Sequence, residues 1–286
     1  MFVPATSFNA ATSLGFAPPK VNSAGGKNVN LLNTEIKKGV TLSTPLMLTW
    51  GLNEFRDEAT GKCSYDLSVQ FPSPNYPNEQ ADAWLEQLKV YEAKIKATAV
   101  EKAKEWFNKP TMSADVVDAL WTPMLRYKKG PDGMPDETSA PTLRIKIPYW
   151  QGDWKCDIYD MDDAALYPND NGVTPMELVP KLTNLAMIIS SGGVWFANGK
   201  FGTTWKLVQA KVKPRASLRG KCHISLSSSE RNTLEAQKDQ EDDMQPTEVV
   251  DSDEEDDPAQ DATAAEEAAA APEPKKKRVV KKKTPA

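Results

Sequence analysis

The sequence is poor in the residues from which metal centres, disulfide frameworks and many catalytic sites are built. Its 286 residues include 3 cysteines and 1 histidine. Cys63, Cys156 and Cys222 are odd in number and widely spaced, which argues against a secreted disulfide framework and fits a reducing compartment. His223 stands beside Cys222, but this pair supplies fewer ligands than a zinc site needs. We therefore predict no catalytic residues, no metal site and no cofactor.

Two further patterns argue against an enzyme. No glycine-rich loop is followed by Lys-Ser or Lys-Thr, as a phosphate-binding loop requires. The acidic group Asp160, Asp162 and Asp163 is compatible with Mg²⁺, but no second cluster of ligands accompanies it. We interpret this group as a solvated turn.

Long hydrophobic runs and late aromatic residues are missing as well. No run is long enough to span a membrane, and the first residues lack the basic start and apolar core of a signal peptide. We expect a soluble, intracellular protein without membrane contact. Every Trp, Tyr and Phe lies at or before Trp205. A segment without large apolar side chains buries too little surface to offset the entropy of ordering, so the globular part should end near Leu226.

Charge is distributed unevenly along the chain, although the net charge is only −5. Residues 1–229 hold 26 Lys and Arg against 23 Asp and Glu, residues 230–273 hold 17 acids and 2 bases, and residues 274–286 hold 7 bases and no acid. The mildly basic body, the acidic tether and the basic tip are therefore treated as separate regions with different interactions. The chain is thus predicted to have four parts: a loosely ordered arm (1–39), a folded domain (40–226), a disordered acidic tail (227–273) and a basic tip (274–286).

Hydrophobic periodicity predicts several strands and one long helix. Residues 63–71 alternate cleanly, and 40–50, 142–150 and 154–160 are also strand-like. Over 79–107 large apolar residues recur at steps of three and four, as in a helix that begins after Asn78. A short second helix is predicted from Ser113. This pattern indicates a mainly β, α+β fold, in which a small, partly open barrel carries a long inserted helix.

The clearest local pattern is a hairpin over 185–213. Asn198-Gly199 between two β-rich runs is typical of a two-residue turn, since both residues tolerate positive φ. That turn predicts the pairs Phe196–Phe201, Gly192–Trp205, Ile189–Val208, Met187–Ala210 and Leu185–Val212. The last three pairs are wholly apolar and assign one face to the core.

Aromatic rings and cations share the open faces of the predicted strands. Bases stack on rings regardless of sequence and cations follow phosphates, so this combination suits single-stranded nucleic acid. The candidate binding residues are Arg144, Lys146, Trp150, Phe196, Lys200, Phe201, Trp205, Lys211 and Lys213. The alternative is that the rings pack on the long helix, whose Trp84 and Trp106 must be buried. Stacking is favoured for Phe196 and Phe201, and the choice stays open for Trp150 and Trp205.

A second basic and aromatic cluster precedes these strands. Arg126, Lys128 and Lys129 surround Tyr127, just before the turn-rich stretch 131–137. This cluster fits a nucleic-acid contact or a solvated loop, and both interpretations stay open.

The acidic and basic blocks at the end of the chain have different predicted roles. The acidic tail either aids solubility or competes with nucleic acid for the basic body and meets partners once displaced. Lys275, Lys276, Lys277 and Arg278 resemble a nuclear import signal, within reach of an import receptor. The alternative is a basic arm on DNA phosphates. Import is favoured, which predicts a nuclear protein.

The hairpin GGVWFANGKFGTTWKLVQAKVK (192–213), the β-rich body with its inserted helix and the acidic tail resemble one family. It comprises the single-stranded-DNA-binding proteins of large nucleo-cytoplasmic DNA viruses of algae and amoebae, which are similar to the OB-fold single-strand binders of short-tailed bacteriophages. The resemblance covers roughly residues 40–226. It implies an OB barrel that binds single strands in replication, recombination or repair, and a tail that contacts replication proteins, in an infected host cell. The phage proteins end on the acidic tail and an aromatic residue, whereas a basic segment without aromatics follows here.

Two other classes stay open. A virion structural or DNA-packaging protein would tolerate the same β-body and charged arms, but would show no strong preference for single strands. An acidic chromatin-associated chaperone would bind basic proteins through residues 239–257 and bind DNA weakly. No oligomeric state follows from the sequence.

Overall fold

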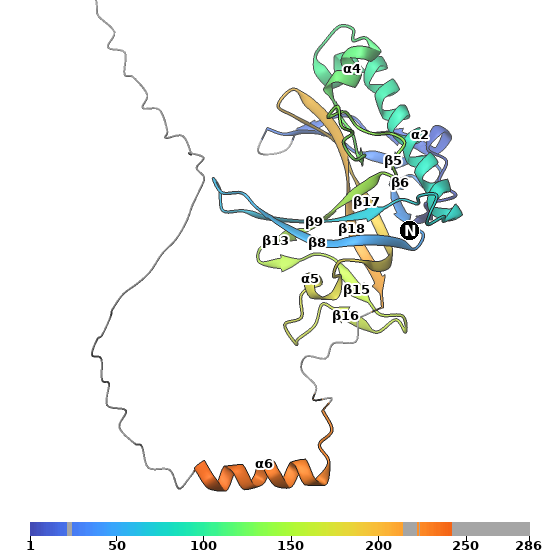
Figure 1. Cartoon of the computed structure of the whole chain (residues 1–286). Helices are drawn as coiled ribbons and strands as arrows, with labels where there is room; N and C mark the ends of the chain where they lie inside the picture. The colour runs from blue at the N-terminus through green and yellow to red at the C-terminus, as the bar shows by residue number, and fades with distance from the viewer. Residues whose placement is uncertain (22–24, 214–221, 223, 242–286) are drawn as a thin grey trace, which may run out of the picture. The chain divides into compact units, whose positions relative to one another are not determined.

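Five strands close into a ring in this computed structural model, which describes residues 1–21, 25–213, 222 and 224–241. The ring consists of β8 (Met47–Arg56), β9 (Cys63–Gln70), β12 (Thr142–Ile147), β18 (Lys200–Val212) and β17 (Thr183–Ala197), in this order. β17 pairs with both β18 and β8, so the ring has no open side. β12 and β18 run parallel, and the other neighbours are antiparallel. A five-stranded barrel is the OB architecture, so the predicted OB-like α+β fold is confirmed (Figure 1).

Short strands extend the barrel or form small sheets beside it. Those in the barrel sheet are β1 (Val3–Pro4), β3 (Lys20–Val21), β4 (Lys27–Val29), β7 (Thr41–Ser43), β10 (Trp121–Thr122), β11 (Leu125–Arg126), β15 (Asp157–Tyr159) and β16 (Ala165–Tyr167). A second sheet contains β2 (Leu14–Phe16), β5 (Leu31–Asn33) and β6 (Lys38–Gly39), and a third contains β13 (Tyr149–Trp150) and β14 (Asp153–Trp154). The β8–β9 hairpin projects from the barrel on the side away from the main helices (Figure 1).

The N-terminal segment is part of this fold, and the prediction of a loose arm over 1–39 is corrected in its described residues. β1 pairs with β7, β4 pairs with β17, and a short helix, α1 (Ala10–Ser13), lies between β1 and β2. Phe8 and Leu31 are buried in the core. The segment has a low average hydrophobicity, so nothing in the sequence indicated that single apolar side chains in it each fill a core position. The edges of the barrel supply the hydrogen bonds that the segment lacks alone.

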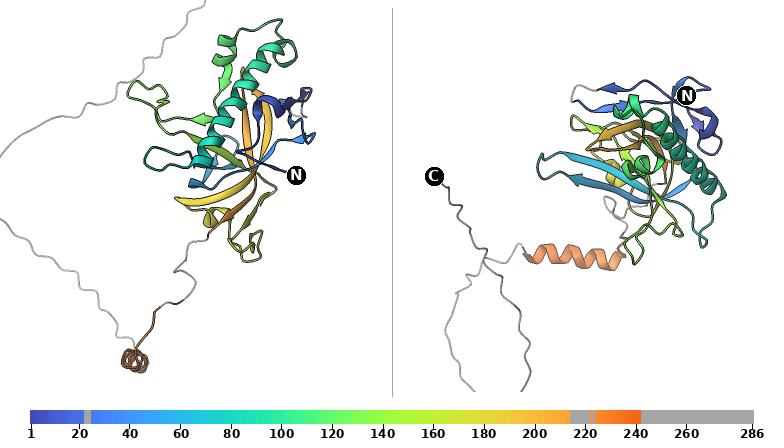
Figure 2. Two further views of the ribbon diagram at one scale, coloured as in Figure 1. Left: turned by 90° about the vertical axis from the view of Figure 1, so that its right-hand side faces the viewer. Right: turned by 90° about the horizontal axis from the view of Figure 1, so that it is seen from above.

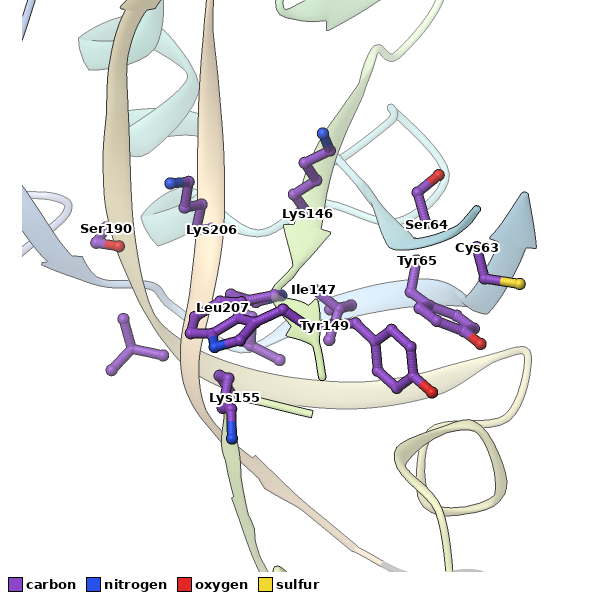
Figure 3. A pocket seen from close by; sticks show the side chains of 13 residues that line it. Cys63, Ser64, Tyr65, Lys146, Ile147, Tyr149, Lys155, Ser190, Lys206 and Leu207 are labelled. Carbon is purple, nitrogen blue, oxygen red and sulfur yellow. The ribbon is translucent and has the colours of Figure 1, made fainter. Parts of the chain in front are cut away.

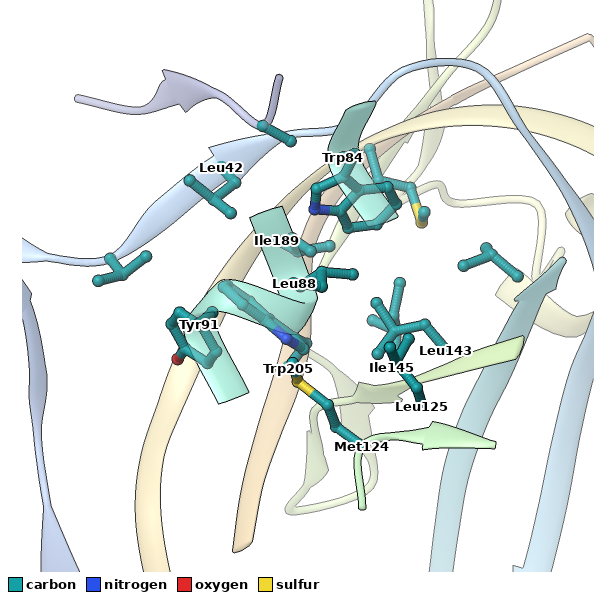
Figure 4. Close-up of a cluster of buried hydrophobic side chains, with 14 of the residues drawn as sticks. Leu42, Trp84, Leu88, Tyr91, Met124, Leu125, Leu143, Ile145, Ile189 and Trp205 are labelled. Carbon is teal, nitrogen blue, oxygen red and sulfur yellow. The ribbon is translucent and has the colours of Figure 1, made fainter. Parts of the chain in front are cut away.

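The long helix packs its apolar stripe against the barrel. α2 (Glu79–Glu101) begins where predicted, because the Asn78 side chain accepts a hydrogen bond from the Ala81 amide at 3.1 Å. The Tyr91 and Trp205 rings lie 5.3 Å apart, and Tyr91 contacts the Ser191 hydroxyl of β17 at 3.0 Å, so α2 lies against β17 and β18 (Figures 2 and 4).

The predicted helix over 79–107 is divided at Lys102. α3 (Ala103–Phe107) follows it and ends at Asn108, which has a φ of 57°. α4 (Ala114–Leu120) begins after Ser113, as predicted. α5 is a single turn (Pro175–Leu178). Within the described residues, none of the helices combines the length and the apolar character that crossing a membrane requires.

The hairpin has the predicted turn but a different register in its middle. Asn198 and Gly199 have φ values of 50° and 73°, and the pairs Phe196–Phe201, Met187–Ala210 and Leu185–Val212 are as predicted. Between these pairs Trp205 lies opposite Ser191, and Ile189 lies opposite Leu207. The predicted pairs Gly192–Trp205 and Ile189–Val208 are therefore wrong. One irregularity lies between Ser191 and Val194, and in the other Val208 is the extra residue on β18.

These two bulges reverse the predicted faces of each strand between its bulge and the turn. An extra residue moves every side chain beyond it to the opposite face of a strand. Phe201 and Trp205, predicted on the open face, are therefore 0% exposed, whereas Val208, predicted in the core, is 38% exposed. The alternative of packing on the long helix is the correct one for Trp205.

The chain divides into Met1–Ser217 and Leu218–Ala286. In the second unit, residues 228–241 form α6 (Ser228–Glu241), where a disordered tail was predicted from 227. The Ser227 amide donates to the Glu230 carboxylate at 2.8 Å and the Glu230 amide donates to the Ser227 hydroxyl at 3.4 Å, a capping box that favours a helix without any core. The rest of the predicted tail and the tip over 274–286 lie outside the described residues.

Candidate functional site

An open cavity of about 450 Å³ lies on the outer surface of the barrel. Its wall combines side chains of β9, β12, β17 and β18 with those of the segment after β12 (Figure 3). Lys146, Lys155 and Lys206 line it together with Tyr65, Tyr149 and Trp150. The cavity thus gathers cations and aromatic rings from segments that are far apart in the sequence.

Lys146 and Lys206 form the centre of this positive surface. They are direct partners in the parallel pairing of β12 and β18, and both side chains are exposed. Within the described part of the chain, neither makes an ion pair. Partners on one face hold their Cβ atoms about 5 Å apart, so the two positive charges reinforce each other at this point.

The nearest acid on this face is neutralised by its own partner. Asp66 lies opposite Lys146 across β9 and β12, but it is buried and forms an ion pair with Arg144. Arg144 therefore compensates Asp66 and leaves Lys146 and Lys206 uncompensated. The face keeps a positive potential although it contains a carboxylate.

Trp150 supplies the exposed ring of the site. Its side chain is 54% exposed, and the Lys155 ammonium group lies 5.9 Å from the centroid of its ring. Lys155 also forms an ion pair with Asp153, two residues before it in the chain. A cation beside an exposed ring offers one phosphate contact and one stacking platform at neighbouring points.

The other rings of the cavity support this turn. Tyr65 and Tyr149 line the cavity and pack together with Trp154 of β14, with centroid distances of 4.1 to 5.1 Å. Burial, with a smaller contribution from the charge of Glu54, raises the pKa of Tyr65 to about 12. The Tyr65 hydroxyl is therefore neutral at physiological pH and adds no negative charge to the cavity.

Three of the predicted binding residues lie where the sequence placed them. Arg144, Lys146 and Trp150 are exposed, while Leu143, Ile145 and Ile147, on the other face of β12, are buried. The alternation of β12 is therefore confirmed. Of the three, Lys146 and Trp150 line the cavity.

The hairpin residues form no such surface. Besides the buried Phe201 and Trp205, Phe196 is partly buried against Phe107, at a centroid distance of 5.3 Å. The Lys200 ammonium donates to the Ala119 carbonyl at 3.2 Å, at the end of α4. The open face that was predicted for Phe196 and Phe201 is thus an aromatic packing contact.

The two lysines at the far end of β18 keep the predicted orientation. Lys213 is exposed, and Lys211 forms an ion pair with Asp163 at 2.6 Å. Neither lines the cavity. The predicted import residues Lys275, Lys276, Lys277 and Arg278 lie outside the described residues.

Lys155 and Lys206 are the cations that the sequence analysis missed. Lys206 was not among the predicted open-face residues, because the bulge at Val208 that places it there was not foreseen. Lys155 directly follows Trp154 of β14, and a cation next to a hairpin with a tryptophan in each strand was the available signal.

A second, larger cavity of about 1180 Å³ lies beside the cluster around Tyr127. Side chains of α2, α4 and the segment 122–137 line it, among them Arg126, Tyr127 and Lys129. These residues of the cluster thus form one wall of a cavity.

Acidic and sulfur ligands do not converge in the described residues, which contain no group of three or more His, Cys, Asp or Glu placed to hold a metal. The Asp160 carboxylate accepts hydrogen bonds from the amides of Asp162 and Ala164 at 2.9 Å, as the predicted turn requires. His223 lies outside the described residues.

Comparison with family models and with curated proteins gives no match. Among solved structures, the chain is similar to the single-stranded DNA-binding protein of bacteriophage Enc34 in complex with ssDNA, with a TM-score of 0.39 and 11% identity over 71% of this chain and 98% of that one. It is also similar to gp2.5, a single-stranded DNA-binding protein of bacteriophage T7, with a TM-score of 0.37 and 10% identity over 65% of this chain and 98% of that one. Likenesses of this degree assign no function.

Proposed function

We propose that this chain binds single-stranded DNA, without base preference, on the outer face of its barrel. The observation that carries the proposal is the placing of Lys146, Lys155 and Lys206 around a cavity beside the exposed ring of Trp150. Lysines contact phosphates and a ring stacks on any base, so neither contact reads the sequence. The proposed activity is binding and not catalysis.

The geometry favours single strands over duplex. In a duplex the bases are stacked on each other and cannot reach a protein ring, whereas an unpaired base can stack on Trp150. A duplex would be held by the lysines alone. The preference for single strands therefore depends on the ring, and the salt dependence depends on the lysines.

A titration tests this proposal. The full chain is titrated with a fluorescent oligo-dT of about 16 nucleotides, and with duplex of equal length, at two salt concentrations. We expect tighter binding of oligo-dT, with log affinity falling by about 0.7 per phosphate contact for each unit of log salt. Equal affinity for duplex would contradict the proposal and favour a packaging protein. Binding of basic proteins without DNA binding would favour an acidic chaperone.

The cellular role that we propose is protection of single strands during replication, recombination or repair in a nucleus. The 7 bases of residues 274–286 support nuclear import, and the resemblance to viral single-strand binders supports an infected host cell. The 17 acids of residues 230–273 support both auto-inhibition of DNA binding and recruitment of replication proteins.

Deletion of residues 275–283 tests the import role. A bulky fluorescent fusion is needed, because a chain of 31.5 kDa is small. The deletion should move the fusion from nucleus to cytoplasm at unchanged DNA affinity. An unchanged distribution with weaker DNA binding would show that the tip is a phosphate-binding arm.

A further inference from the structure

Strand pairing joins the two cavities along one face. Arg126 of β11 lies directly opposite Thr142 of β12 in an antiparallel pair, and directly opposed residues share a face. Along β12, Thr142, Arg144 and Lys146 also share that face, because side chains alternate. A line of side chains therefore runs from Lys146 at the first cavity to Arg126 at the second. The β12 part of this line, from Thr142 to Lys146, is about 14 Å long, because it spans four steps of roughly 3.4 Å each.

Two cations of the second cavity are free of ion pairs among the described residues. Arg126 and Lys129 are exposed, and neither makes an ion pair with any residue that the structure describes. Lys96 also lines the cavity, but it is paired with the Glu92 and Asp118 carboxylates at 3.1 and 3.2 Å.

The other charged groups offset the charge of Arg126 and Lys129 in sum, but none of them forms an ion pair with either residue in the part of the chain that the structure describes. Lys89 lines the cavity and is paired with Glu86 at 2.7 Å. Glu137 is the remaining acid of the lining. The positive charge that a phosphate would meet is therefore local to Arg126 and Lys129, which make no ion pair with a described residue, and the half-buried ring of Tyr127 lies between them in the sequence.

The surface between the cavities suits a strand as well. The buried Asp66 is neutralised by Arg144. Beside Thr142, Gln70 of β9 accepts a hydrogen bond at 3.2 Å from the indole of Trp50, whose side chain is exposed. Within the described part of the chain, a single strand on this route meets cations without ion pairs at both ends and an exposed ring along one side.

We propose that a longer single strand leaves the first cavity along β12 and enters the second cavity, where Arg126 and Lys129 contact its phosphates. This inference rests on the proposed function and adds a route and a second contact. It predicts that a long oligonucleotide contacts more lysine and arginine side chains than a short one does. The occupant of the second cavity is thus the same strand that Lys146 and Lys206 bind.

Two lengths of oligo-dT test the route on the full chain. Oligonucleotides of about 5 and about 16 nucleotides are titrated against the wild type and the double variant Arg126→Ala/Lys129→Ala. The variant should bind the long oligonucleotide more weakly, with a log–log salt slope smaller by about 1.4 for the loss of two phosphate contacts. Affinity for the short one should be unchanged.

A matched control removes two exposed lysines elsewhere. Lys104→Ala/Lys109→Ala, within and just after α3, should change neither affinity nor slope. If Arg126→Ala/Lys129→Ala leaves the long oligonucleotide bound as before, the route is wrong although the proposed function stands. If it weakens both lengths equally, Arg126 and Lys129 belong to the first contact and the second contact is wrong. If the wild type binds neither length, the proposed function itself fails.

Discussion

Lys146 and Lys206 are direct partners across the parallel strands β12 and β18, and both ammonium groups reach solvent. Like charges opposite each other destabilise a sheet. Asp66 lies opposite Lys146 on the other side but is engaged by Arg144. The barrel therefore holds, beside an open cavity, two positive charges without ion-pair partners among the residues that the structure describes. Such an arrangement is expected at a site that binds an anion.

The double variant Lys146→Ala/Lys206→Ala separates binding from stability. It should lower the affinity for oligo-dT and reduce the log–log salt slope by about 1.4, because two phosphate contacts are lost. The free energy of unfolding should stay the same or rise by up to about 1 kcal/mol, since the repulsion disappears. Urea denaturation and a salt series of titrations measure the two effects. An unchanged slope would remove these lysines from the interface.

Trp150→Ala tests the stacking platform. Loss of one stacked base should weaken oligo-dT binding by about 1–3 kcal/mol. The salt slope should be unchanged, because no charge is removed. Tyr76→Ala, at an exposed ring outside both cavities, is the control and should bind like the wild type. Equal behaviour of the two variants would show that Trp150 contacts no base.

The features that the sequence predicted correctly are those that depend on near neighbours. The alternation of β9 and β12, the Asn78 and Ser113 caps and the Asn198-Gly199 turn are all specified within a few residues. Each follows from the local rules of strands, caps and turns. The barrel follows from the number and spacing of such strands.

The bulges of the hairpin depend on distant partners. Besides β18, β17 pairs with β4, β7 and β8, and its register must satisfy all of them. The sequence of the hairpin alone cannot specify this, so Phe201 and Trp205 were assigned to the wrong face. The first cavity could not be predicted either, because Lys155 and Lys206, which line it, come together only after the chain folds.

Val208 and its neighbour Leu207 test the bulge directly. Leu207 is buried, so Leu207→Asp should lower the free energy of unfolding by about 3 kcal/mol or more, because it places an unpaired charge in the core. Val208 is the exposed bulge residue, and Val208→Asp should cost less than about 1 kcal/mol. Equal destabilisation by both variants would contradict the bulge.

The same position also probes the cavity, which Val208 lines. Val208→Asp should weaken oligo-dT binding, because the carboxylate lies near Lys206 and repels phosphates. Val208→Lys should have the opposite effect. Both variants must keep the melting curve of the wild type for this comparison to apply.

Cys63 reports on occupancy of the cavity, because it lines the wall and is partly exposed. A hydrogen bond to Glu54, then burial, raises the pKa of the Cys63 thiol. Thiol reagents attack the thiolate, so Cys63 should react slowly at pH 8, and its rate should still rise with pH beyond the ordinary thiol range. In a Cys222→Ser variant Cys63 is the accessible thiol, because Cys156 is buried and burial raises its pKa to about 12.

Saturating oligo-dT should slow the labelling of Cys63 further, since a bound strand covers the cavity. Glu54→Gln is the control for the chemistry: without the carboxylate the pKa of Cys63 falls, the thiolate fraction at pH 8 grows and the thiol reacts faster. Protection by oligo-dT should persist in that variant, because Glu54 is not among the cavity residues. A labelling rate that oligo-dT leaves unchanged, under conditions where binding is measured independently, would place the DNA elsewhere on the barrel.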